Sequence, residues 1–269
     1  MALPSVGVAS RVSGFDRPVL AQERTAYHTL QQGIEQYNAE QFTEAIQLWR
    51  QAAVGFDQQG QPLQQAFVWS NLSLAYQQLA LWPDAEAAIA RSFELLQTPE
   101  TPETPSPESA AVTAKAWNAQ GYLYWHQGQL EPALAAWRQA TTRYHQAEDR
   151  SGVILTHLNQ ARVLQALGLN RQAIATLETT HHLLQTAPVA VQALGRLHLG
   201  DALRRIGALE DSAQILNAAV ELAPDAQIRG QAQLALANTD RAFSHREIAI
   251  GEDAAAQNHA AAPCSATQP

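Results

Sequence analysis

Apolar and polar positions along the chain follow a pattern that recurs about every forty residues. A small residue is followed twelve positions later by another small residue, and sixteen positions later by a large apolar one. The series comprises Gly33–Ala45–Trp49, Ser73–Ala85–Ile89, Gly121–Ala133–Trp137, Ala161–Ala173–Leu177 and Gly200–Ser212–Leu216, and a sixth opening residue, Ala237, has no partner. Such spacing is typical of helical hairpins that bury their apolar faces by stacking on one another. The pattern therefore predicts an all-α solenoid, an architecture that offers a binding surface rather than a reaction centre.

Each period is predicted to form a helix A, a short turn and a helix B. The opening small residue of helix A lets helix B approach closely, and the small residue early in helix B faces it across the hairpin. We expect the large residue one turn later to fill the gap toward the next hairpin. Ala, Gln and Leu dominate the composition, and few Val, Ile or Thr residues alternate as they do in strands.

Three segments depart from this pattern. Residues 1–25 carry no helical period, and residues 243–269 are rich in Ala with interspersed polar residues. Residues 98–109 contain proline every two or three positions, which favours an extended connection over a helix. We therefore predict a solenoid over residues 26–242 with a loop insertion at 98–109. Residues 1–25 are predicted to be disordered or the remnant of a leader, and residues 243–269 a disordered tail.

Charge and motifs narrow the possible functions. The formal net charge of −8 argues against a nucleic-acid partner, and no stretch reaches the roughly 18 apolar residues of a membrane span. Cys264 is the only cysteine, so no intrachain disulfide can form. The sequence lacks the phosphate-loop, dinucleotide-binding, nucleophile-elbow and zinc-protease motifs, and its histidines are scattered over separate hairpins. We predict a protein without catalytic activity, cofactor or metal.

The N-terminal segment leaves the compartment open. Val19-Leu20-Ala21 is similar to a signal-peptide cleavage site, but Arg11, Asp16 and Arg17 interrupt the apolar part before it. The sequence as written indicates a cytoplasmic protein, and a start site placed too far downstream of an export signal would give the same appearance.

The repeat resembles the tetratricopeptide repeat family in its forty-residue class, the class found in kinesin light chains. The hairpins begin at about Ala26, Ala66, Ala114, Ile154 and Ala193, and the best matches to the motif are Trp69, Leu72, Ser73, Tyr76, Trp82 and Ala85, followed by Trp117, Gly121, Tyr124, Gly128, Leu130 and Ala133. The resemblance implies a right-handed superhelix of about five hairpins plus one extra helix, with a concave groove lined by the A helices. It is specific for the fold and nearly silent on function.

A narrower resemblance concerns segments such as residues 39–49, 70–79 and 159–168, which are similar to the repeat region of cyanobacterial CHAT-domain proteins. In those proteins the repeats precede a caspase-like peptidase domain with a Cys–His dyad. Cys264 lies in a polar segment with no folded surroundings to activate it, so we do not extend the resemblance to peptidase activity.

Counting along the A helices gives the predicted groove residues. In the first part of the chain they are Asn71, Gln77, Asn118, Tyr122, Trp125, His126 and Asn159, and in the second part Arg162, Asp201, Arg204, Arg205 and Arg241. Asparagine offers a donor and an acceptor to the backbone of an extended peptide, and the arginines could receive carboxylates. The alternatives are ordinary surface polar residues for the first set and a solvated face with ion pairs for the second.

These observations predict a non-catalytic scaffold that binds a peptide or helix of a partner protein in its concave groove. The alternative is the detached regulatory arm of a CHAT-type peptidase. The sequence identifies neither the partner nor the oligomeric state.

Overall fold

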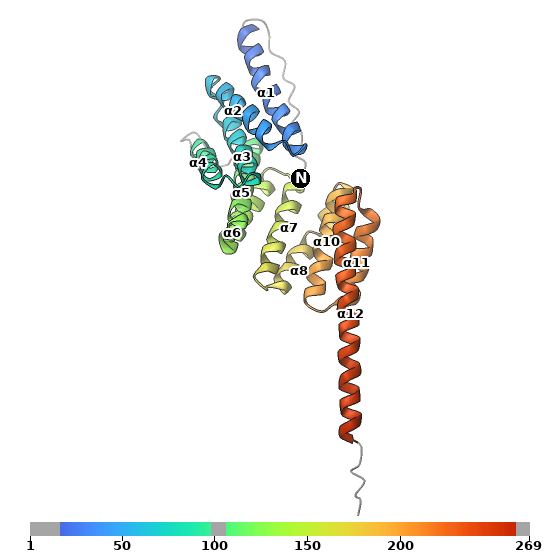
Figure 1. The fold of residues 1–269 in the computed structure, drawn as a ribbon. Coiled ribbons are helices and arrows are strands. Elements are labelled where there is room, and N and C mark those ends of the chain that lie inside the picture. The colour runs from blue at the N-terminus through green and yellow to red at the C-terminus, as the bar shows by residue number, and fades with distance from the viewer. Residues whose placement is uncertain (1–16, 98–105, 262–269) are drawn as a thin grey trace, which may run out of the picture. The chain divides into compact units, whose positions relative to one another are not determined.

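The computed structural model describes residues 17–97 and 106–261, and every regular element in these ranges is a helix (Figure 1). The helices are α1 (Arg17–Asn38), α2 (Phe42–Gln58), α3 (Pro62–Gln78), α4 (Trp82–Leu96), α5 (Pro107–His126), α6 (Leu130–Gln146), α7 (Arg150–Ala166), α8 (Asn170–Thr179), α9 (His181–Gln185), α10 (Val189–Arg205), α11 (Leu209–Leu222) and α12 (Ala226–Ala261). The predicted all-α fold is confirmed.

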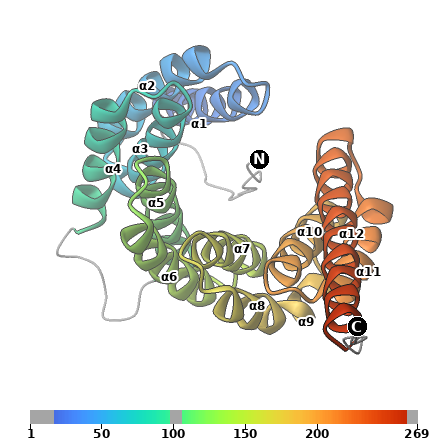
Figure 2. The same cartoon turned by 60° about the horizontal axis from the view of Figure 1, so that its bottom comes forward.

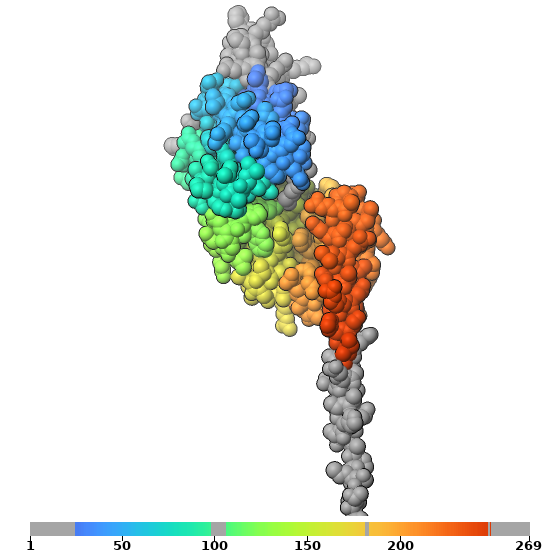
Figure 3. All heavy atoms as spheres, in the orientation of Figure 1, coloured from blue at the N-terminus to red at the C-terminus, as the bar shows by residue number. Residues whose placement is uncertain are grey.

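The chain forms two compact units, which meet in sequence after Leu167. Unit 1 contains α1 to α7, and unit 2 contains α8 to α12. In unit 1, α1, α3, α5 and α7 form an inner layer, while α2, α4 and α6 form an outer layer (Figure 2). Successive hairpins of this unit stack in chain order in the space-filling view (Figure 3). The inner layer of unit 1 corresponds to the A helices of the predicted repeat.

Most helices end in a left-handed turn that recurs about every twenty residues. The residues with positive φ are Glu40, Gly60, Ala80, Gly128, Glu148, Gly168 and Gly207. The amide that follows such a residue reaches back over the helix end, as from Leu81 to the Tyr76 carbonyl at 2.9 Å. This hydrogen bond satisfies a carbonyl that the helix leaves free, and glycine adopts the required conformation without steric cost.

The spacing of sixteen residues has a direct physical basis in both units. A Cβ atom placed on Gly33 would lie 2.3 Å from Nε1 of Trp49, and one on Gly121 would lie 2.6 Å from Nε1 of Trp137. Trp49 also donates to the Leu30 carbonyl of its own hairpin at 3.2 Å. The large residue therefore packs against the opening residue of its own helix A, whereas we expected it to fill the gap toward the next hairpin.

The helical segments extend beyond the predicted solenoid boundaries. Helix α1 begins at Arg17 and α12 continues to Ala261, so the predictions of non-helical residues up to 25 and beyond 242 are wrong in these parts. Alanine is the best helix former, and the composition of the tail favours a helix for that reason. Residues 1–16 and 262–269, about which the same prediction was made, lie outside the described residues.

The proline-rich segment is shorter than predicted. Helix α5 already begins at Pro107, and the hydroxyl of Ser106 accepts a hydrogen bond from the amide of Ser109 at 3.1 Å. Proline is well suited to the first position of a helix, because its missing N–H would have no partner there. Residues 98–105, the rest of the predicted insertion, lie outside the described residues.

The sixth opening residue is Thr239 rather than Ala237. Thr239 is fully buried and its hydroxyl lies 3.1 Å from that of Ser212, whereas Ala237 is exposed. Ala232, which is also fully buried, occupies the first position of this A helix, seven residues before Thr239. Alanine is abundant in this helix, so the pattern of small residues points to Ala237. The buried Thr239 instead occupies the position that corresponds to the opening residues of the other hairpins.

Candidate functional site

The inner layer of unit 1 carries a cluster of aromatic and polar side chains on α5 and α7. The guanidinium of Arg162 lies over the ring of Trp125, 5.0 Å from its centroid. Asn159, one turn before Arg162, donates from Nδ2 to the hydroxyl of Tyr122 at 3.0 Å. Trp125 and Arg162 are partly exposed. This cluster presents a cation over an aromatic face, an arrangement suited to a carboxylate with a planar or apolar neighbour.

A second set of contacts fixes the rings of this cluster. Trp137 of α6 donates from Nε1 to Oδ1 of Asn118 at 3.0 Å. Its ring packs edge-to-face on Tyr122 with a centroid distance of 5.3 Å, and lies 6.4 Å from that of Trp125. Asn118, predicted to face a peptide, therefore already uses its carbonyl oxygen inside the hairpin. The residue as a whole is partly exposed.

Lys115 adds a second cation to the inner layer, nearer the beginning of α5. It is the only lysine in the sequence, and its Nζ lies 4.4 Å from the ring centroid of Phe67 on α3. Burial lowers the pKa of Lys115, and the negative charge of Asp149 partly opposes this shift. The predicted groove set did not include Lys115, because only its contact with Phe67 distinguishes it from a solvated lysine.

Burial also shifts the titration of the neighbouring groups. It raises the pKa of Tyr122, against the opposing effects of the Asn159 hydrogen bond and the charge of Arg162. Burial, followed by the charge of Arg162, lowers the pKa of His126. The ring of His126 lies 6.1 Å from that of Trp82 on α4. Arg162 therefore acts on a phenol and an imidazole in addition to the indole it covers.

Three predicted groove residues are too buried to meet a peptide. Asn71, Gln77 and Asn159 are 2%, 4% and 4% exposed. Gln77 donates to the hydroxyl of Ser73 at 3.1 Å and to the carbonyl of Ala119 on α5 at 3.0 Å. Gln77 and Asn159 therefore join one inner helix to the next. Counting predicted these side chains in the groove, whereas Gln77 and Asn159 contact the neighbouring inner helix and Asn71 is buried.

The predicted positive stripe of unit 2 is largely neutralised by its own carboxylate. Asp201 accepts from Arg204 at 2.6 Å and from Arg205 at 2.9 Å, all on α10. Burial alone would raise the pKa of Asp201, but the hydrogen bonds and charges of Arg205 and Arg204 outweigh it and lower the pKa. Arg241 is exposed on α12. For Asp201, Arg204 and Arg205, the structure thus shows the ion-paired alternative.

The described part of the chain holds no candidate for a metal centre or a membrane span. No group of three or more His, Cys, Asp or Glu residues there could hold a metal ion. None of the described helices is long and apolar enough to cross a membrane.

Comparison with known proteins identifies the class of fold. A tetratricopeptide repeat profile matches residues 114–144, the hairpin of α5 and α6. No curated protein has a sequence that matches this chain. The chain thus has one recognisable tetratricopeptide repeat, in the hairpin that carries most of the cluster described above.

Solved structures of tetratricopeptide-repeat proteins have a similar fold. A protein of this type from Thermus thermophilus is 20% identical, with a TM-score of 0.53, over 78% of this chain and 98% of that one. The tetratricopeptide-repeat sensor of a STAND signal-transduction ATPase from Pyrococcus horikoshii gives 14% identity and a TM-score of 0.64, over 85% of this chain. This chain spans 32% of that ATPase. Kinesin light chain repeats from Podospora anserina give 16% identity and a TM-score of 0.54, over 76% of this chain and 93% of theirs.

These similarities establish a solenoid of tetratricopeptide-type helical hairpins, as predicted. At such low identities they concern the fold alone. The narrower resemblance to CHAT-domain proteins stays a prediction.

Proposed function

We propose that the chain is a non-catalytic protein-interaction scaffold that binds an acidic peptide segment of a partner on the inner layer of unit 1. The observation that carries this proposal is the stack of Arg162 on Trp125, beside Tyr122 and Asn118. Among the described residues no carboxylate forms a salt bridge with Arg162 or Lys115, and only the charge of Asp149 acts on Lys115 from farther away. In a chain with a net charge of −8, two such cations on one layer are well placed to receive negative charge from outside.

The spacing of the two cations suggests the length of the bound segment. Lys115 and Trp125 are ten residues apart on α5, which corresponds to about 15 Å along the helix. An extended peptide covers this distance in about four or five residues. We therefore expect two carboxylates with roughly this separation, and an aromatic or aliphatic residue beside the carboxylate that meets Arg162.

The two rings that support the cations keep the surface ready for binding. A cation that rests on an aromatic face loses less freedom when a carboxylate arrives than a cation on a mobile exposed side chain. The hydrogen bonds of Trp137 and Asn159 hold the rings of Trp137 and Tyr122, and Trp137 lies beside Trp125. This preformed surface is the mechanism by which a rigid hairpin stack would recognise a flexible segment.

Selection from a displayed library of random twelve-residue peptides tests the proposal with the full chain as bait. We expect the enriched peptides to carry paired carboxylates, and their binding to weaken as salt rises. The double variant Lys115→Gln/Arg162→Gln should lower their affinity by at least about 10-fold, because charge-assisted contacts are among the strongest. The matched control is Arg91→Gln/Arg138→Gln, which removes the same charge from exposed positions of α4 and α6.

Three results would contradict the proposal. The first is enrichment of peptides without carboxylates. The second is an equal loss of affinity in the control variant, which would show that net charge alone governs binding. The third is that no peptide is enriched, because the inner layer of unit 1 then does not bind short extended segments.

A further inference from the structure

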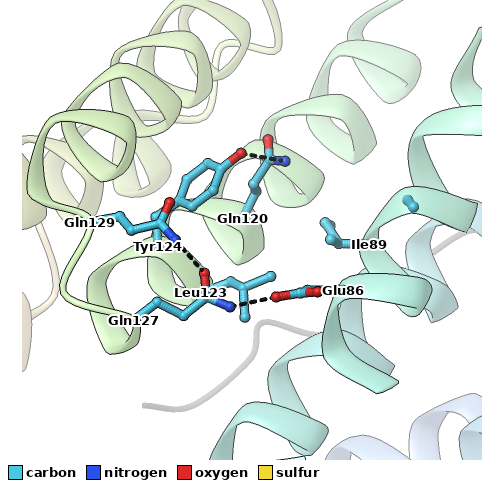
Figure 4. Close-up of a pocket in the computed structure, with 8 residues that line it drawn as sticks. Glu86, Ile89, Gln120, Leu123, Tyr124, Gln127 and Gln129 are labelled. Atoms are coloured by element: carbon cyan, nitrogen blue, oxygen red, sulfur yellow. Dashed lines mark hydrogen bonds between the residues drawn. The ribbon is translucent and has the colours of Figure 1, made fainter. Parts of the chain in front are cut away.

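A pocket of about 260 Å³ lies between α4 and α5 in unit 1 (Figure 4). Ile89 of α4 and Leu123 of α5, each 3% exposed, form its apolar floor. Glu86, Gln127 and Gln129 form its polar rim, close to the turn between α5 and α6. None of these side chains belongs to the predicted groove.

The rim side chains form a connected set of hydrogen bonds. Gln127 donates from Nε2 to Oε1 of Glu86 at 2.6 Å, and Gln129 donates to Oε1 of Gln127 at 3.2 Å (Figure 4). Deeper along α5, Gln120 donates to the hydroxyl of Tyr124 at 3.4 Å. The only charge among the lining residues is the carboxylate of Glu86, and no cation in the described part of the chain pairs with it.

The repeat shows that this rim departs from the pattern of the neighbouring hairpins. The residues at the position of Glu86 are Ile46 in the first hairpin and Leu134 in the third, each 8% exposed. The residues that correspond to Gln127 are Leu79 in the second hairpin and Leu167 in the fourth. Polar residues thus replace apolar ones on both sides of a single junction. The corresponding residues are buried at the Glu86 position, whereas Leu79 is 39% exposed, so the departure from the packing pattern lies at Glu86. A local departure of this kind is typical of a functional site.

The packing of the helices explains why space is left at this junction. Helix α4 packs less extensively on α5 than α2 does on α3 or α6 does on α7. Instead, α5 packs mainly on α3 and α6. The connection between α4 and α5 is also the one that contains the eight additional residues. Phe93 and Trp117 close one end of the α4–α5 contact with ring centroids 4.7 Å apart, and Trp82 and His126 close the other.

We propose that this pocket receives an arginine side chain of a partner protein. The carboxylate of Glu86 and the amide oxygens of Gln127 and Gln129 can accept several N–H groups of one planar guanidinium. The stem of the arginine packs on Ile89 and Leu123. The volume is below the range of about 300–1,000 Å³ typical of small-molecule sites, and suits a single side chain.

The proposal does not depend on the inner-layer site, so a small probe can test it alone. N-acetyl-arginine methylamide is added to the ¹⁵N-labelled full chain, and the side-chain amide signals of Gln120, Gln127 and Gln129 are followed by NMR. Gln127→Leu serves to assign its own signal. We expect saturable shifts of these amides at millimolar probe, and much smaller ones with the citrulline analogue, which is isosteric but uncharged.

Substitution of Glu86 tests whether binding in the pocket depends on the negative charge of its carboxylate. Glu86→Gln keeps the size of the side chain and should weaken arginine binding by at least about 5-fold. Glu44→Gln, an exposed residue of α2, removes the same charge elsewhere and should leave binding unchanged. Glu86→Ile, which installs the residue type of the neighbouring hairpins, should abolish the shifts while the helical circular dichroism persists. Equal binding of citrulline, unchanged affinity in Glu86→Gln, or no saturable shift up to about 20 mM probe would overturn the proposal.

Discussion

The two units build the same hairpin with different side chains. All tryptophans and tyrosines precede residue 168, and Phe243 is the only aromatic residue after it. In unit 1 an indole fills the space above Gly121, whereas in unit 2 the aliphatic side chain of Leu216 fills the space above Gly200. In unit 1, Lys115 and Arg162 lie over aromatic rings, whereas in unit 2 Arg204 and Arg205 form salt bridges with the carboxylate of Asp201. The fold requires small and large residues at fixed positions, and leaves the chemistry of the surface to the other positions.

The largest expected effect on stability comes from replacing the glycine against which the large residue of a hairpin packs. It distinguishes packing by an indole in unit 1 from packing by leucine in unit 2. Gly121→Ala should destabilise unit 1 by about 1–3 kcal/mol, because Trp137 is held by Asn118 and Tyr122 and cannot move aside. Gly200→Ala should have a smaller effect. The new Cβ atom would lie 2.5 Å from Cγ of the fully buried Leu216, but no hydrogen bond or ring contact holds this smaller side chain in place. The gain in helix propensity from alanine, up to about 1 kcal/mol, applies to both variants.

Urea unfolding can follow the units separately, because tryptophan fluorescence reports on unit 1 alone while circular dichroism reports on both. Equal losses of stability in the two variants would remove the distinction between a rigid indole and a flexible aliphatic chain.

Asp201→Asn tests the self-paired cluster of unit 2 and should cost about 1 kcal/mol at neutral pH. The folded state lowers the pKa of Asp201 below the value of about 3.9 in an unfolded chain. Its stabilisation is therefore complete above the unfolded-state pKa, and is lost as the pH falls through the folded-state pKa. Unfolding curves followed by circular dichroism should differ between wild type and variant at pH 7, and converge in strong acid. A difference that persists in acid would show that packing, rather than charge, holds this cluster.

Lys115→Met tests the opposite situation in unit 1, and should stabilise it by up to about 1 kcal/mol at neutral pH. Burial lowers the folded-state pKa of Lys115, so carrying the charge costs the folded protein free energy relative to the unfolded chain. This penalty disappears as the pH rises through the folded-state pKa toward that of the unfolded chain. Arg138→Met, on the exposed side of α6, is the control and should change stability little. A clear loss of stability in Lys115→Met would mean that the contact with Phe67 outweighs the cost of burial, and that Lys115 has a structural role.

The sequence predicts the repeat well because packing leaves few choices at its central positions. Only a very small residue fits above Trp49 or Trp137, so the spacing of sixteen residues is visible without a structure. The segments outside the repeat were harder to predict. Composition alone does not separate an alanine-rich helix from an alanine-rich coil, and α12 extends far beyond the predicted boundary.

The candidate site could be predicted only in part, since counting fixes the helix face of a residue but not its partners. Arg162 lies over the ring of Trp125, a contact that counting does not predict, whereas Asn71 is buried and Asn159 pairs with Tyr122 on a neighbouring helix. The pocket beside Glu86 was missed entirely. Its signal was nevertheless present in the alignment of the repeats, because a glutamate replaces the Ile or Leu of the adjacent hairpins.

The smallest expected effect tests whether Arg162 occupies its place over Trp125 in solution. Burial and the charge of Arg162 both lower the pKa of His126 below its usual 6.5. Arg162→Gln removes the charge and keeps the partial desolvation of the ring, so the pKa of His126 should rise while staying below 6.5. NMR titration of the imidazole signals measures this directly, with Arg138→Gln as a control that removes an equal charge from the outer helix α6. An unchanged His126 titration in Arg162→Gln would place the guanidinium away from the ring. Arg162 would then be a mobile surface charge. It would no longer differ from the ion-paired Arg204 and Arg205 of unit 2 by a fixed contact with an aromatic ring.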